Sequence, residues 1–150
     1  MSVMITAALC GLALNATAPE TPIVPDPVEA EAQVDEEQLY TLSHVIYAEA
    51  GNCCRDMMVS VGSVVLNRVA DDRFPDTIDE VVFQQGQYSC TWDGNFYLTP
   101  STEAVEVAEE LLQEGSKIDS SVVWQAEFPQ GEGVYDTIDS PWGTTMYFCF

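Results

Sequence analysis

The sequence predicts an α+β domain with a helical core followed by a small antiparallel sheet. Apolar residues repeat at helical spacing between about residues 35 and 114. Short β-branched and aromatic runs appear only after residue 121. Because helices precede strands instead of alternating with them, the pattern indicates α+β and not α/β. A chain of 150 residues supports one such core.

Two helices are expected first, from about Asp35 to Ala50 and from about Arg55 to Val69. Gly51 follows the first helix and is interpreted as its stop. Apolar residues cover most of the circumference of the second helix, so we expect it to be central and buried.

A capping-box pattern opens a short helix over residues 77–84, and residues 85–99 are expected to be a loop. A surface helix is predicted over residues 102–114, with its glutamates on the solvent side. Strands are expected over 122–128, 133–138 and 144–150.

The beginning of the chain has a different composition. Residues 3–14 form an apolar run that is too short to span a bilayer, which takes about 20 residues. The run suits a signal peptide over residues 1–18, with Ala16-Thr17-Ala18 as the cleavage site, although no Lys or Arg precedes it. We therefore expect a secreted protein with no stable membrane span. The alternative is an N-terminal hydrophobic helix packed on the domain.

Residues 19–37 hold four Pro, seven acidic residues and no basic ones. This composition cannot bury a core, so it predicts an extended tether before a catalytic domain over residues 38–150. The whole chain has 25 acidic and 4 basic residues, a net charge of −21. Nucleic acids attract clusters of Lys and Arg, so no nucleic-acid partner is expected.

Glu49 interrupts the apolar stripe of the first predicted helix. At about 100° per residue, it lies between Leu42 and Val45 on the helical wheel. Burial and the carbonyl end of the helix both disfavour a carboxylate and should raise its pKa. A carboxylic acid that stays protonated can act as a general acid on a glycosidic oxygen. The structural alternatives are a Glu that reaches solvent from the helix end or one paired with Arg55 or Arg68.

Other catalytic patterns are weaker. The single His44 lies on the polar face of its helix, and one His cannot supply the nitrogen ligands of a zinc amidase. A Cys/His hydrolase would have its residues in the unusual order, with His44 before Cys53 and Cys54. In an exported domain we expect at least one long-range disulfide among the cysteines instead of a metal site.

The predicted loop carries aromatic, amide and hydroxyl groups that suit sugar rings. Gln87, Ser89 and Trp92 are candidate glycan contacts in it, and Gln125 and Tyr147 are candidates in the predicted strands. Tyr88 and Trp92 could equally be core anchors of the loop.

Four sequence blocks resemble the cell-wall hydrolases of the spore cortex-lytic (SleB) type. They occur in the family's order and spacing, and residues 141–144 and 146–148 fit its closing strand more loosely. The blocks are VIYAEAG at 45–51, VGSVVLNRV at 61–69, RFPDTI at 73–78 and VVFQQGQYS at 81–89.

The resemblance implies a lysozyme-like fold and a lytic transglycosylase of peptidoglycan, and we expect the protein to be a monomer. Glu49 matches the family's catalytic Glu, which protonates the oxygen between N-acetylmuramic acid and N-acetylglucosamine. The same residue then acts as base while the muramic 6-hydroxyl closes a 1,6-anhydro ring. The implied mechanism needs no metal, cofactor or second carboxylate.

The chain departs from the family after Glu49, where Ala50-Gly51-Asn52 lacks an Arg and a second Glu. Glu127 is a candidate supplementary acid, although strand alternation predicts that it faces solvent. Two alternatives therefore stay open, an amide-cleaving wall hydrolase and an inactive wall-binding homologue.

Overall fold

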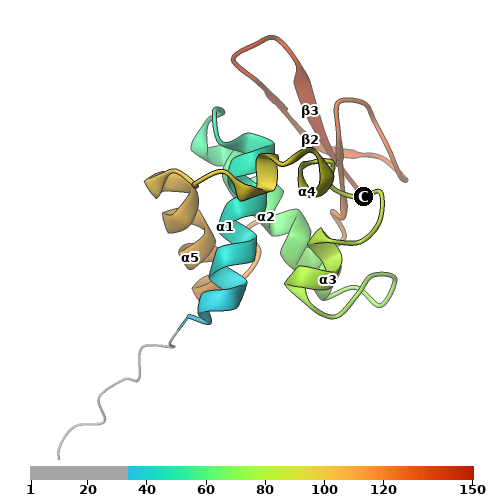
Figure 1. Cartoon of the computed structure of the whole chain (residues 1–150). Helices are drawn as coiled ribbons and strands as arrows, with labels where there is room; N and C mark the ends of the chain where they lie inside the picture. The colour runs from blue at the N-terminus through green and yellow to red at the C-terminus, as the bar shows by residue number, and fades with distance from the viewer. Residues whose placement is uncertain (1–33) are drawn as a thin grey trace, which may run out of the picture. The chain divides into compact units, whose positions relative to one another are not determined.

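The computed structural model describes residues 34–150, which form six helical segments and three strands (Figure 1). The predicted signal peptide and most of the predicted tether lie outside these residues. None of the described helices is long and apolar enough to cross a membrane. The elements are α1 (Glu36–Ala50), α2 (Arg55–Val69), α3 (Ile78–Val82), α4 (Cys90–Asp93), the 3₁₀ helix η1 (Asn95–Tyr97), α5 (Thr102–Glu114), β1 (Trp124–Ala126), β2 (Val134–Asp139) and β3 (Thr145–Cys149).

The predicted long helices are confirmed. Asp35 caps α1 by accepting a hydrogen bond from the Glu37 amide at 2.9 Å. Gly51 ends α1, as predicted, and has a right-handed φ of −61°. Glycine is required there because a Cβ would lie 2.4 Å from the Tyr47 ring.

Helix α2 is central, as predicted, and packs against both α1 and α5. Gly62 lies at this crossing, and a Cβ there would meet the side chains of Leu111 and Ile46 within 3 Å. The close approach lets apolar side chains of three helices form one core.

The short segments after α2 differ from the prediction. Thr77 caps α3 as expected, accepting from the Glu80 amide at 3.2 Å, but α3 ends at Val82. The predicted loop over residues 85–99 contains α4 and η1. Gly94, with a φ of +92°, joins these two short helices. Neither helix is long enough to produce a detectable apolar period.

The strands form an antiparallel sheet in the order β1-β3-β2. Phe148 of β3 is fully buried in the helical core and pairs with Gln125 of β1. A bulge in β2 near Tyr135 shifts the register between Val134 and Asp136. β1 and β3 are shorter than predicted, and β2 keeps the predicted length but begins one residue later.

Two neighbouring residues of α2 connect the helices to the sheet. The Asn67 amide donates to the carbonyls of Asp119 and Val122 at 2.8 and 2.9 Å. The Arg68 guanidinium donates through Nε to the Val123 carbonyl at 2.7 Å. Both side chains are buried, and they hold the segment that leads into β1.

We expect Asn67→Ala to destabilise the protein because the buried Val122 carbonyl loses its donor, whereas the Asp119 carbonyl keeps its bond from the Val122 amide at 3.0 Å. An unsatisfied buried group costs about 1–3 kcal/mol, so the free energy of unfolding should fall by about that amount. Urea unfolding measures this change. The control is Asn95→Ala, which removes an exposed amide bonded to Asp93 and should have little effect. Equal effects of the two substitutions would contradict the role of Asn67.

Candidate active site

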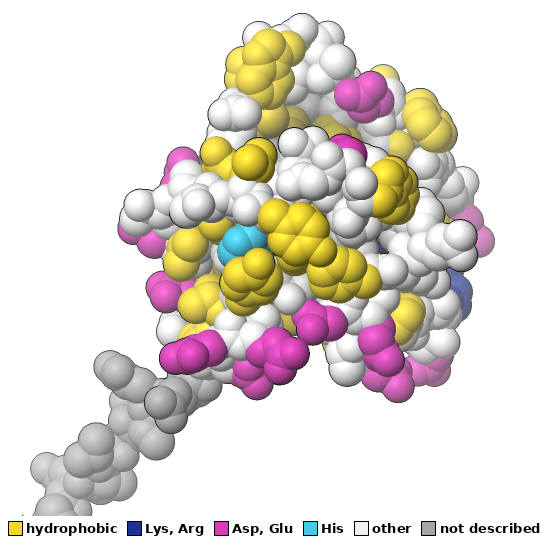
Figure 2. All heavy atoms as spheres, in the orientation of Figure 1, with side chains coloured by type: hydrophobic (Ala, Val, Ile, Leu, Met, Phe, Trp, Pro, Cys, Tyr) yellow, Lys and Arg dark blue, Asp and Glu magenta, His cyan; other side chains and the backbone are white. Residues whose placement is uncertain are grey.

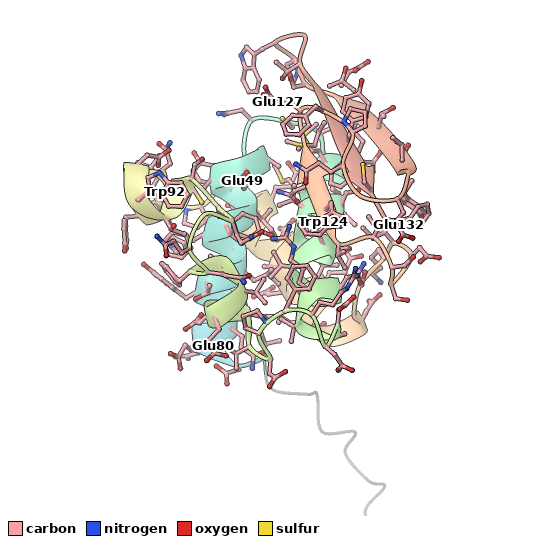
Figure 3. All side chains as sticks on the ribbon, turned by 90° about the vertical axis from the view of Figure 1, so that its right-hand side faces the viewer. Glu49, Glu80, Trp92, Trp124, Glu127 and Glu132 are labelled. Atoms are coloured by element: carbon pink, nitrogen blue, oxygen red, sulfur yellow. The ribbon has the colours of Figure 1, made fainter. Side chains whose placement is uncertain are left out.

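Glu49 lies in the last turn of α1 and is half-buried, on the side of the molecule that faces the sheet (Figure 3). It lines a cavity of about 160 Å³ between the α1–α2 turn and the sheet. Figure 3 shows Glu127 above Glu49, at the end of β1. The cavity is lined by Glu49, Cys53, Met57, Glu127, Ser140, Trp142, Thr144 and Met146.

Burial raises the pKa of Glu49 above its usual value of 4.5. The hydrogen bond from the Cys90 thiol opposes this shift, the charge of Asp93 adds to it, and the charge of Arg68 opposes it. The net direction is upward, as the sequence predicted, and favours the protonated acid. Burial also raises the pKa of the Cys90 thiol, to about 12, so the thiol stays a donor toward Glu49.

Arg68 is a buried cation whose charge acts on Glu49 without direct contact between the two. Its guanidinium lies 5.2–5.7 Å from the ring centroids of Phe74, Tyr88 and Trp124. Glu49 makes no ion pair with any residue of the described region, and Arg55 pairs instead with Glu110 at 2.7 Å. The ion-paired alternative for Glu49 is therefore wrong.

Among the six residues predicted for the site, only Glu49 lines the cavity. Trp92 is exposed on α4, and Ser89 is exposed immediately before this helix. The same helix brings Cys90 to Glu49. Gln87 is half-buried in the turn before them. As glycan contacts, these three stay predictions.

The two strand residues predicted as glycan contacts lie outside the cavity. Tyr147 alternates with the cavity residue Met146 and so points to the other face of β3. Gln125 of β1 has a buried side-chain oxygen without a hydrogen-bond partner among residues 34–150. Both assignments also stay predictions.

Sequence reasoning missed the wall of the cavity that the sheet supplies. Glu127 is exposed, as strand alternation predicted. It follows the last residue of β1, Ala126, and it lines the cavity, which alternation did not predict. The motif Pro141-Trp142-Gly143-Thr144 resembles the family's closing strand, but this resemblance predicts no role for Trp142. Only the sheet pairing brings this turn to Glu49.

The remaining polar candidates lie elsewhere. His44 packs among aromatic side chains, 3.9 Å from Tyr40 and 5.5 Å from Phe96 between ring centroids, and Figure 2 shows it surrounded by hydrophobic groups. A larger cavity, about 440 Å³, lies at the opposite end of α1. Within residues 34–150, no three His, Cys, Asp or Glu side chains are grouped to hold a metal ion.

The cysteines of the described region are all free thiols: Cys53, Cys54, Cys90 and Cys149. The expected long-range disulfide is therefore not found among them. Cys53 lines the cavity, Cys54 is exposed, and Cys90 and Cys149 are buried in the fold.

Comparisons with known proteins agree on one family. The family described as Cell Wall Hydrolase matches residues 55–130, which begin after Glu49. Spore cortex-lytic enzymes of Bacillus cereus and Oceanobacillus iheyensis are 30% and 29% identical over 105 residues, 67% of this chain. The chain spans about a third of the length of these relatives, 36% and 34%.

Two solved structures share the fold. The catalytic domain of the germination-specific lytic transglycosylase SleB from Bacillus anthracis has a TM-score of 0.62 at 20% identity, over 79% of this chain and 98% of that one. The catalytic domain of the Bacillus cereus SleB protein has a TM-score of 0.62 at 19% identity, over 79% and 94%. The predicted α+β class is thereby confirmed as the fold of this catalytic domain.

Burial of Glu49 leads us to expect that Glu49→Gln stabilises the protein at neutral pH. With a folded-state pKa above 4.5, the unfolded chain ionises first as pH rises, so the folded wild type loses relative stability. The variant should therefore be more stable than the wild type at about pH 7.5, and the difference should shrink as pH falls through the raised pKa toward 4.5 and stay constant below that.

Urea unfolding at several pH values measures this difference. Glu103→Gln, at an exposed position of α5, is the matched control and should follow the wild type. A gain for Glu49→Gln that is the same at every pH would show that ionisation of Glu49 is not its cause.

Proposed function

The chain belongs to the cell wall hydrolase family, and we propose that it cleaves the glycan strands of peptidoglycan as a lytic transglycosylase. The observation that carries this proposal is the position of Glu49. This carboxyl group has a raised pKa and lines a cavity formed by both halves of the fold. The name of the solved SleB domain from Bacillus anthracis supports the same reaction class.

The reaction begins with protonated Glu49. It donates its proton to the oxygen between the anomeric carbon of N-acetylmuramic acid and N-acetylglucosamine. The carbon–oxygen bond breaks, its electron pair stays on the leaving oxygen, and positive charge develops at the anomeric carbon. The Glu49 carboxylate then removes the proton of the muramic 6-hydroxyl as that oxygen bonds to the anomeric carbon. The products are a 1,6-anhydro sugar and a free hydroxyl, and Glu49 is protonated again.

The surroundings of Glu49 suit both of its protonation states. Burial favours the acid that starts the reaction. The Cys90 thiol and the charge of Arg68 favour the carboxylate formed after proton transfer. Because these influences oppose each other, neither state is strongly trapped, which is what a residue acting as acid and then as base requires.

Hydrolysis is the second candidate outcome, and Glu127 favours it. Glu127 lines the same cavity as Glu49 and could activate a water molecule from across the site. The product would then carry a reducing end in place of the anhydro ring.

The chain belongs to a family of cell wall hydrolases, so we propose that it acts outside the cytoplasm, on the cell wall. Residues 1–18 would direct its export.

We expect purified protein to release anhydro-muropeptides from peptidoglycan and Glu49→Gln to lose this activity. Removing a general acid costs at least ~100-fold in rate. Mass spectrometry of the products measures both results. The matched control, Glu132→Gln, changes an exposed Glu outside the cavity and should keep wild-type activity.

Other products would identify another reaction. Reducing-end saccharides would indicate hydrolysis, and free stem peptides would indicate an amidase. An absence of products from the wild-type protein would support the inactive wall-binding alternative.

We also expect EDTA to leave the rate unchanged, because each proton in the proposed reaction moves to or from Glu49. The measurement is release of anhydro-muropeptides before and after dialysis against the chelator. Activity that is lost on chelation and restored by Zn²⁺ would contradict the mechanism.

A further inference from the structure

Trp142 lies in the turn between β2 and β3 and borders the cavity of Glu49. Its side chain is 67% exposed although it is one of the largest apolar groups in the protein. A tryptophan exposed at the rim of a cavity typically contributes to ligand binding and not to the core.

The turn that carries Trp142 is held by its own hydrogen bonds. The Ser140 amide donates to the Thr144 carbonyl at 2.7 Å, and the Thr144 amide donates to Ser140 Oγ at 3.1 Å. The two hydroxyl groups of these residues also lie 2.6 Å apart. Gly143 completes the turn with a φ of +84°, a conformation that favours glycine. The backbone beneath the indole is therefore fixed before a ligand binds, which lowers the entropy cost of binding.

The other groups of the cavity indicate the kind of ligand. Met57 and Met146 add apolar surface, whereas Glu49 and Glu127 supply carboxyl groups. No Lys or Arg lines the cavity, so nothing there would balance the charge of an anionic ligand. A neutral ring with one apolar face and polar edges fits this combination, and the N-acetylglucosamine ring next to the cleaved bond has that form.

We propose that Trp142 is a substrate-binding residue that stacks on the sugar ring next to the bond that Glu49 cleaves. This inference rests on the proposed function for the identity of the sugar. It adds a stacking contact from the sheet side of the site, opposite the helix that carries Glu49.

The first test is steady-state kinetics on soluble glycan strands freed of stem peptides, with the full-length protein. Trp142→Ala should raise KM about tenfold or more, the change expected when a buried aromatic contact is lost. Trp142→Phe keeps an aromatic face and should stay within about threefold of the wild type. Phe128→Ala is the matched control because Phe128 is 61% exposed on the same part of the chain and does not line the cavity.

The second test measures binding without turnover, in the Glu49→Gln background. The same glycan strands should change the tryptophan fluorescence, and Trp142→Phe should remove most of that change. This measurement reports on Trp142 even if the wild-type protein releases no anhydro product, so failure of the proposed reaction and failure of the inference are separate results.

The inference is overturned if Trp142→Ala matches Phe128→Ala in KM and in glycan binding. It is equally overturned if Trp142→Ala lowers kcat alone, or if Trp142→Phe leaves the fluorescence response intact. Trp142 is exposed, so its variants should unfold at the wild-type temperature. A large fall in that temperature would assign Trp142 a structural role and would also overturn the inference.

Discussion

The attachment of the sheet to the end of α2 is the constraint on which the rest of this structure depends. Asn67 and Arg68 together hold three carbonyls in residues 119–123, just before β1. β1 pairs with β3, β3 pairs with β2, and the β2–β3 turn carries Trp142. The helices therefore form one wall of the cavity and the sheet forms the other. Asn67 and Arg68 position the sheet wall, because the strand pairings link it to the segment that they hold.

Arg68 has a second effect because of where this attachment places it. A buried cation is costly unless it is paired, yet Arg68 has no carboxylate within ion-pair distance in the region that the structure describes. Three aromatic faces surround its guanidinium instead. Its charge is therefore not cancelled by a neighbour and acts on Glu49. The same residue contributes to architecture and to the electrostatics of the site.

The sequence was sufficient for features that repeat within one element. Helices α1, α2 and α5 have a clear apolar period, and the misplaced acid at Glu49 is visible from the same period. The cavity could not be predicted in this way because its residues come from two helices and from the sheet. Their approach depends on strand pairing, for which local patterns hold little information. Gly51 is a smaller example. A side chain at this position would collide with the ring of Tyr47, and this contact exists only once the turn after α1 has formed.

The strand order also bears on how the site assembles. β3 comes last of the three strands along the chain but lies in the middle of the sheet, so neither β1 nor β2 has its neighbour until β3 has docked. The β2–β3 pair is local in sequence, whereas the bonds from Asn67 and Arg68 that hold the sheet to α2 join residues 52–55 positions apart, and contacts between such distant segments generally form more slowly. Attachment of the sheet over Glu49 should therefore be a late event in folding. Catalytic competence would then be acquired late, and a partly folded chain would hold the acid without the surface that presents substrate to it.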